Sequence, residues 1–498
     1  MRNSSRGHKP ARLFMLLILV FPVLSQAQLI SVKSVPVATA EQFLLVPSQN
    51  LGMGGVAIAV EDPSLDPFVN SAKGARIHGA YVFSAPVFSN IFENNGSART
   101  LPLGVLLGSG KWFGGMNVAV QQFSGRERFE DFGRARLDRF ASPTSLLLAD
   151  QNPKNLYAAG LIGTKLPGTG LALAASASWA ELEAMQGVDF LYANSSRINQ
   201  YGHIADFRVG LLYENLHRPS FELLLLHNRV DMTHEVYYDW WFWEGDGIWP
   251  WNTVVQNLDQ TNTWGLHAGS MMPLGNQSTR AGLIFTVNKK SHPKIPNYEL
   301  MNIPRDPGDT WAFNFGAGIS RTKKSGILAM DLIYEPIWSH TWADAAEPVQ
   351  TERGIIIPAG GKTVENYFRF NNGVVRLGLH EQDKIFGFQL GLQVRFINYR
   401  LKQDDFVGGT RRTQKEFWGE WTPSFGLNMN LASVQIRYAG SLTAGTGQPG
   451  VASNFWFRTA DAAGQNFIVA PSGSLTLQEA VVLTHQISVV VALQAFTP

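Results

Sequence analysis

Apolar and polar side chains alternate along the segment from Lys384 to Arg400, KIFGFQLGLQVRFINYR. Its even positions, from Phe386 to Phe396, are all apolar, whereas its odd positions, from Gly387 to Arg395, are glycine or polar. Successive side chains of a β-strand point to opposite faces, so this segment has one apolar face and one small or polar face. At about 3.3 Å per residue it can cross a hydrocarbon layer of roughly 25–30 Å even when tilted. The pattern predicts a strand of a transmembrane β-barrel.

The same alternation returns in hairpins from about residue 74 onwards. Short connections that carry Gly, Pro, Asn or charge alternate with long ones, an asymmetry typical of bacterial outer-membrane barrels. We expect about sixteen strands with both barrel ends on the short-turn side, or fourteen if one hairpin lies in a loop. A soluble sandwich or propeller also alternates, but its strands usually run about 5–6 residues, and several segments here are about twice as long. The long connections are expected at residues 89–99, 125–153, 184–202, 232–260, 289–308, 339–365, 401–413 and 443–478.

Composition fits this fold class, an all-β transmembrane antiparallel barrel of about 14–16 strands. The mean hydropathy is −0.05, which excludes a bundle of apolar membrane helices. Only 16% of residues are charged, against about 25% in typical soluble domains, and the 48 glycines and 31 phenylalanines suit lumen positions and aromatic girdles. The net charge of +2 and the lack of a long basic run give no reason to expect a nucleic-acid partner. No cysteine is present, which excludes disulfides and thiolate chemistry.

The N-terminus has the pattern of an export signal. A basic stretch is followed by the apolar run Leu13–Leu24 and the small-residue site Ser25-Gln26-Ala27, so residues 1–27 are expected to be a cleaved signal peptide. A membrane anchor would need about 20 apolar residues. We therefore predict export and residence in the bacterial outer membrane.

Residues 28–73 do not follow the hairpin pattern. They contain the glycine-rich stretch Gly52-Met53-Gly54-Gly55, an acidic turn with proline, and Asn70-Ser71-Ala72. Small residues let one backbone pack against another, as a segment inserted into a barrel requires. We expect residues 28–73 to form a hatch, or plug, in the lumen and residues 74–498 to form the barrel. The alternative is a periplasmic tail that is ordered only by packing on the lumen.

The order of these motifs resembles the N-terminal hatch of the FadL-like outer-membrane family. That family includes transporters of long-chain fatty acids and aromatic hydrocarbons, with PorV/PorQ-like proteins of Bacteroidetes as a branch. The Met53-Gly54-Gly55 core is more similar to the PorV-type branch, and the family's Asn-Pro-Ala falls on Asn70-Ser71-Ala72, where serine replaces proline. The resemblance implies a hatch in the lumen, capture of hydrophobic molecules by extracellular loops, and sideways exit through the wall. For the PorV-type branch it implies handling of cargo proteins in type IX secretion.

The expected loop 232–260 is unusually rich in tryptophan: Trp240, Trp241, Trp243, Trp249 and Trp251. Exposed aromatic clusters suit contact with an apolar ligand, a sugar or a protein. An aromatic belt at the outer leaflet and a small core within the loop are the alternatives.

No catalytic, cofactor or metal motif is complete, so we expect a protein that is not an enzyme and has no cofactor. Gly445–Gly450 matches G-x-G-x-x-G in letters but does not open a helix after a parallel strand. A mixed-charge cluster in 125–153 suits a solvated surface or lipopolysaccharide phosphates. The leading hypothesis is an outer-membrane channel or transporter for hydrophobic small molecules, with outer-membrane lipid, lipopolysaccharide and the ligand as partners. The alternative is a PorV-like protein-handling barrel with secretion-system partners.

Overall fold

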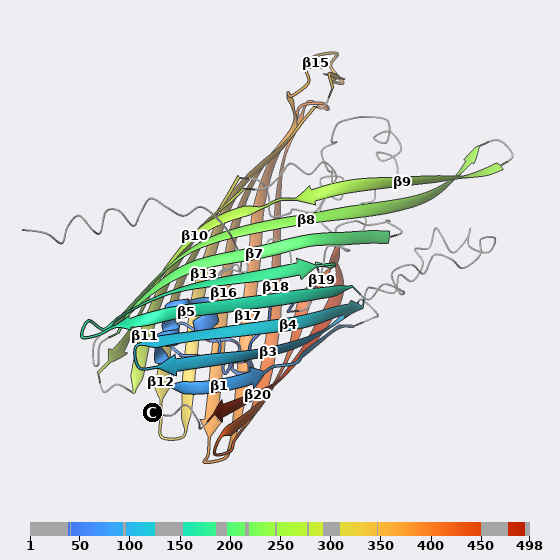
Figure 1. Ribbon diagram of the computed structural model, residues 1–498. Coiled ribbons are helices and arrows are strands. Elements are labelled where there is room, and N and C mark those ends of the chain that lie inside the picture. The colour runs from blue at the N-terminus through green and yellow to red at the C-terminus, as the bar shows by residue number, and fades with distance from the viewer. Residues whose placement is uncertain are drawn as a thin grey trace, which may run out of the picture.

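The computed structural model (Figure 1) describes residues 38–39, 41–92, 96–124, 153–185, 197–214, 219–244, 247–275, 278–291, 309–345, 347–449 and 477–493. The expected signal peptide, residues 1–27, lies outside them. The strands are β1 Gly79–Ser84, β2 Val87–Ile91, β3 Ser97–Ser109, β4 Trp112–Ser124, β5 Lys154–Leu166, β6 Leu171–Leu182, β7 Arg197–Tyr213, β8 Ser220–Glu244, β9 Gly247–Asp259, β10 Asn262–Leu274, β11 Thr279–Ser291, β12 Asp309–Thr322, β13 Gly326–Asp344, β14 Val349–Gln350, β15 Ile356–Ile357, β16 Lys362–Gln382, β17 Phe386–Asp405, β18 Thr410–Asn430, β19 Val434–Pro449 and β20 Leu477–Leu493. The helices are η1 Leu51–Met53, α1 Asp66–Val69 and η2 Ser71–Arg76.

All strands except the small β14–β15 ribbon belong to one antiparallel sheet that closes on itself. The first strand pairs with the last, with Ala80 opposite Leu493. β1 and β2 are collinear, since both pair with β3 and β20 in an unchanged register around Pro86, which has no N–H to donate. β9 and β10 likewise follow one another along β8. Counted this way, the wall is a closed barrel of 16 strands, as predicted.

Side chains alternate between an apolar outer face and a polar inner face. On β4, Met116, Val118 and Val120 are exposed, whereas Asn117 and Gln121 are buried. β17 follows the same pattern, because Phe386 and Leu390 are exposed while Gln389 is buried. A closed barrel with an apolar exterior and a polar interior spans a membrane, because its backbone groups bond between neighbouring strands and its apolar side chains face lipid.

Several of the expected loops are strands. The region 232–260 was expected to be a loop and instead forms the β8–β9 hairpin, which pairs from Met232–Asp259 to Glu244–Gly247 and extends past the neighbouring strands (Figure 1). Similarly, β17 and β18 continue through most of 401–413. The expectation was wrong because ladder hydrogen bonds continue beyond the membrane, where outward side chains no longer need to be apolar.

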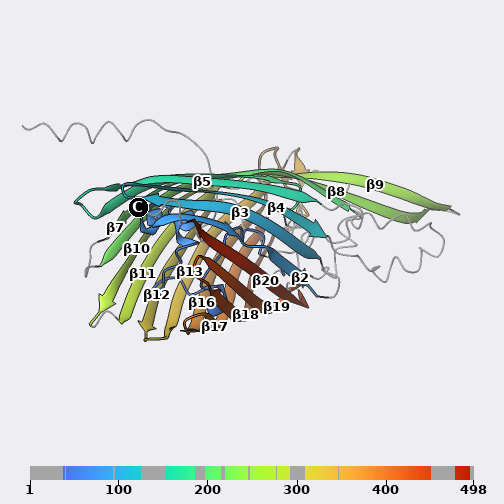
Figure 2. The same ribbon diagram turned by 60° about the horizontal axis from the view of Figure 1, so that its bottom comes forward.

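The N-terminal segment lies inside the barrel, as the blue coil in Figures 1 and 2 shows. The first wall strand begins at Gly79, five positions later than the expected boundary at 74, because residues 71–76 form η2. Among the described residues, no helix has the length and apolar character needed to span a membrane.

Candidate functional site

The described N-terminal residues, 38–39 and 41–78, form what we call the plug segment. It follows the inner wall around the lumen and is hydrogen-bonded to inward-facing side chains from ten strands. These wall residues are Gln121 on β4, Tyr157 on β5, Arg208 on β7, Glu222 on β8, Arg280 on β11, Ser320 on β12, Asp331 on β13, Gln389 on β17, Ser424 on β18 and Gln486 on β20. The plug segment is therefore bound on all sides of the lumen.

The predicted glycine motif lies where the plug segment comes closest to the wall. Gly52 is the middle residue of η1 and Gly54 follows its last residue, with a φ of 70°, a left-handed conformation that favours glycine. A Cβ on Gly52 would lie 2.8 Å from the Cα of Gly426, and one on Gly391 would lie 1.9 Å from the nitrogen of Gly54. Glycine is thus needed on both sides of this contact. Met53 is buried in a cluster that also contains Val56, Val60 and Ala329, and Gly55 also has a φ of 70°.

A buried carboxylate binds the next part of the plug segment. Asp331 Oδ2 on β13 accepts hydrogen bonds from the backbone N–H groups of Ala57, at 2.8 Å, and Ile58, at 3.3 Å. Ile58 packs over a second set of wall glycines, among them Gly282 and Gly318, where a Cβ would come within 3 Å of it. The sequence therefore provides glycine where the plug backbone approaches and a carboxylate where its amides need an acceptor.

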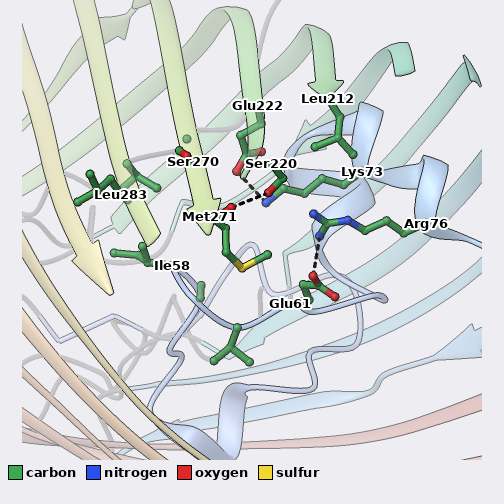
Figure 3. A pocket seen from close by; sticks show the side chains of 14 residues that line it. Ile58, Glu61, Lys73, Arg76, Leu212, Ser220, Glu222, Ser270, Met271 and Leu283 are labelled. Carbon is green, nitrogen blue, oxygen red and sulfur yellow. Dashed lines mark hydrogen bonds and ion pairs between the residues drawn. The ribbon is translucent and has the colours of Figure 1, made fainter. Parts of the chain in front are cut away.

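Charged side chains join the end of the plug segment to β8 and the β7–β8 turn (Figure 3). Lys73 Nζ lies 3.0 Å from Glu222 Oε1, and Asn70 donates a 2.8 Å hydrogen bond to Glu222 Oε2. Arg76 lies 2.6 Å from Glu214 and 3.5 Å from Asp66. The pocket beside these residues has about 20 Å³ open to a water-sized molecule, which is room for about one water and none for a hydrocarbon. This charge cluster holds the plug segment against the wall and is not a ligand site.

Burial changes the protonation of two carboxyl groups in the plug segment. It raises the pKa of Asp66 to about 6, although Lys73 and Arg76 lower that pKa in part. Burial also raises the pKa of Asp62, which accepts hydrogen bonds from Ser48 Oγ at 2.8 Å and from the amide of Gln49 at 2.7 Å. Acid is therefore expected to affect how the plug segment docks.

The predicted Asn70-Ser71-Ala72 motif begins η2 and is almost completely buried. Asn70 Oδ1 accepts a 3.2 Å hydrogen bond from the amide of Ala72, and its amide group donates to Glu222. Ser71 is the first residue of η2, and its hydroxyl is buried without a hydrogen-bond partner among the described residues. Asn70 thus links the plug segment to the wall at the point where the chain turns toward β1.

Toward the long-loop side, part of the inner wall is apolar. Glu335 and Arg395 form a buried ion pair of 3.1 Å on β13 and β17, and farther along the same strands Ile337 and Leu401 are buried hydrophobic side chains of the inner wall. We call this set the lumen apolar patch. It consists of Ala312, Ile337, Phe368, Phe370 and Leu401, with Trp418 packed against it.

Next to the lumen apolar patch, the hydrogen-bonded ladder between β18 and β19 stops. Trp421 and Ala444 are the last partners, and within the described chain Thr410–Glu420 of β18 pairs with β17 alone. The register of β19 shifts between Thr443 and Thr446, and Ala38 of the plug segment donates to the carbonyl of Gly447 beyond that shift, at 2.9 Å. We call this interruption the β18–β19 seam.

The predicted tryptophans lie in the β8–β9 hairpin. Trp240 is the register partner of Trp251, Trp241 of Pro250 and Trp249 of Phe242, while Trp243 lies opposite Ile248. The structure thus brings the five tryptophans together on one ribbon, away from the plug segment. The mixed-charge stretch 125–152 falls outside the described residues.

Sequence reasoning identified the plug motifs but not their partners in the wall. Asp331, Ser424 and Glu222 occupy polar positions of alternating strands, and that alternation marks them as inward-facing. Nothing in the alternation distinguishes the inward residues that bind the plug segment from those that do not. The lumen apolar patch could have been found as inward positions that are hydrophobic.

The fold and its interior define a transmembrane β-barrel with its N-terminal segment folded into the lumen. No family model matches this sequence, and no curated protein matches it. Among solved structures, the chain is similar to a FadL homologue of Pseudomonas aeruginosa, with 10% identity, coverage of 92% of this chain and 100% of that chain, and a TM-score of 0.44. It is also similar to the Ralstonia pickettii toluene transporter TbuX, with 10% identity, coverage of 89% and 97%, and a TM-score of 0.39. A third similar structure is CdiB from Acinetobacter baumannii, with 8% identity and a TM-score of 0.37. The match covers 83% of this chain but only 60% of CdiB. These similarities concern the barrel fold.

Proposed function

We propose that this protein is an outer-membrane channel for hydrophobic small molecules, such as long-chain fatty acids or hydrocarbons, with the plug segment as its gate. The observation that carries the proposal is the position of the lumen apolar patch. It lies on the long-loop side of the plug segment and includes Trp418, which is on the strand that borders the β18–β19 seam.

An apolar molecule gains free energy wherever it leaves water, at about 25 cal/mol for each Å² of apolar surface. Phe368 and Phe370, with ring centroids 5.9 Å apart, are buried at the centre of this patch, and a ligand would gain such contact by moving between the side chains of the patch. The plug segment blocks the way toward the periplasm, since it is bound on all sides of the lumen. The ligand therefore leaves the lumen laterally, through the β18–β19 seam and into the membrane.

The test is uptake of a labelled long-chain fatty acid by cells that lack the protein and are complemented with variants. Phe368→Ala combined with Phe370→Ala should lower uptake strongly. A matched pair on the outer face, Phe386→Ala with Phe388→Ala, should leave it unchanged. Unchanged uptake in the deletion strain, together with copurification of the barrel with a much larger translocon, would contradict the proposal and favour a PorV-like role in protein secretion.

A further inference from the structure

The outer face of β16, β17 and β18 carries a row of basic side chains on the long-loop side. Arg369 is the register partner of Arg400, and Arg400 is the register partner of Lys415. Lys402 follows two positions beyond Arg400 and therefore points to the same face. All four side chains are exposed. We call these four residues the basic row.

The basic row has no counter-charge within the described part of the chain. None of its four side chains has an ion pair or hydrogen bond there. The nearby acidic side chains are already paired, Glu365 with Lys362 and His340, and Asp404 with Arg411. Like charges that face each other directly across strands repel. An anion from outside the protein would remove this repulsion.

The basic row borders directly on the apolar band of the barrel. The outward positions from Phe386 to Phe396 on β17, and from Phe417 to Leu427 on β18, carry no charged side chain. Phe396 and Phe417 stack with ring centroids 6.2 Å apart, and Trp338 is the register partner of Arg369. Aromatic side chains of this kind mark the level where lipid headgroups begin. A ligand that matches both regions has an anionic head and acyl chains.

We propose that the basic row binds the phosphorylated headgroup of an outer-leaflet glycolipid of the lipid A class, with the acyl chains against the apolar band below it. Arginine binds phosphate through two parallel hydrogen bonds, and lysine acts as a compact charge. Two arginines and two lysines on adjacent strands suit a headgroup with more than one phosphate. The proposal depends on membrane residence of the barrel and not on what passes through its lumen, so loss of fatty-acid uptake has no bearing on it.

The test uses the full chain in a neutral detergent and measures bound lipid by native mass spectrometry. The probes are diphosphorylated lipid A, the same lipid without its phosphates, and inorganic phosphate. Arg369→Gln, Arg400→Gln and Lys415→Gln together should weaken binding of diphosphorylated lipid A by about tenfold or more. The control removes the same charge from exposed positions at the short-turn end, with Lys323→Gln, Lys324→Gln and Lys384→Gln, and should bind like the wild type.

Equal binding by the triple variant and the wild type would overturn the proposal. So would equal binding of the lipid without phosphates, or complete displacement by millimolar inorganic phosphate, which would assign the row to a free anion. Heat-modifiable gel mobility checks that the variant folds. If the triple variant fails that check, Arg400→Gln alone, at the centre of the row, replaces it.

Discussion

The amide of Gly54 in the plug segment donates a 2.9 Å hydrogen bond to Ser424 Oγ on β18, and that hydroxyl donates to the carbonyl of Gly52 at 3.2 Å. One side chain of the wall therefore bonds both an amide and a carbonyl at the η1 turn. The turn can come close enough for this only because glycines line both sides. A small change in shape at this point should separate plug and wall.

Gly391→Ala tests the close contact between the η1 turn and the wall. The added methyl would lie 1.9 Å from the nitrogen of Gly54, so the plug segment must move, and we expect docking to weaken by about 1–3 kcal/mol. Limited proteolysis of the plug segment in the folded barrel measures the change. Gly373→Ala is the control, because the nearest atom to its Cβ is 3.9 Å away. Equal cleavage of the two variants would show that the close contact does not hold the plug.

Glu222→Ala should weaken docking more than any exposed charge change. It removes the 3.0 Å partner of the largely buried Lys73, which keeps only the more distant Asp66 at 3.9 Å, and breaking one side of a buried pair costs about 3–5 kcal/mol. The double variant Lys73→Met with Glu222→Leu should lose much less, because no charge is left unpaired. Arg229→Ala, which breaks an exposed pair with Asp231, is the control and should cost about 0–1 kcal/mol. Proteolysis and ion conductance in planar bilayers report plug release, and a double variant as leaky as Glu222→Ala would refute this explanation.

Docking of the plug segment should strengthen as the pH falls from about 6 to about 4. Burial raises the pKa of Asp66 from 3.8 to about 6, so in this window the docked state holds a proton that the undocked state has lost. Acid therefore makes the free energy of docking more favourable, by up to about 3 kcal/mol once the pH has fallen below about 4. Above pH 6 the carboxyl is ionised in both states, and docking no longer depends on pH through this group. Other charged groups surround Asp66, namely Lys73, Arg76 and Asp62. The pH dependence of proteolysis between pH 4 and 7 should therefore be measured for both the wild type and Asp66→Asn. That variant should show a flatter pH dependence, and an unchanged one would assign the effect to another group.

Ser71→Pro should be tolerated or slightly stabilising. Ser71 is the first residue of η2, a position that suits proline, and Asn70 before it has φ and ψ of −122° and 106°, in the extended region that a following proline requires. The change also removes a buried hydroxyl without a partner in the described structure. Thermal unfolding measures the result. A decrease beyond that of Ser71→Ala would show that the amide of Ser71 is needed or that the proline ring does not fit.

The barrel could be predicted from the sequence because the alternation of apolar and polar residues is visible within each strand and is required by the lipid on one face and the lumen on the other. Phe386, Leu390 and their equivalents must face lipid, and one shift of register would expose the polar face instead. The plug motif was also recognisable in the sequence, since Gly54 and Gly55 have a positive φ, which favours glycine. Its partners were not readable, because Ser424 and Asp331 lie 370 and 274 residues away from the amides that they bind. The length of the β8–β9 hairpin was missed because its ladder extends where apolar alternation no longer applies.

Replacing Trp240, Trp241 and Trp243 with alanine should reduce binding of the ligand or partner while leaving the barrel intact. Among the described residues, β8 pairs with β7 only as far as Tyr237, so the tryptophan-bearing end of the hairpin pairs within itself. Loss of a cross-strand pair costs about 0.2–1 kcal/mol, which is too little to open a closed barrel. Heat-modifiable mobility should therefore stay normal while fatty-acid uptake falls. The matched control removes three tryptophans from the outer wall, Trp264, Trp311 and Trp338, and should leave uptake unchanged. A collapse of mobility in the hairpin variant would instead mean that these tryptophans are structural.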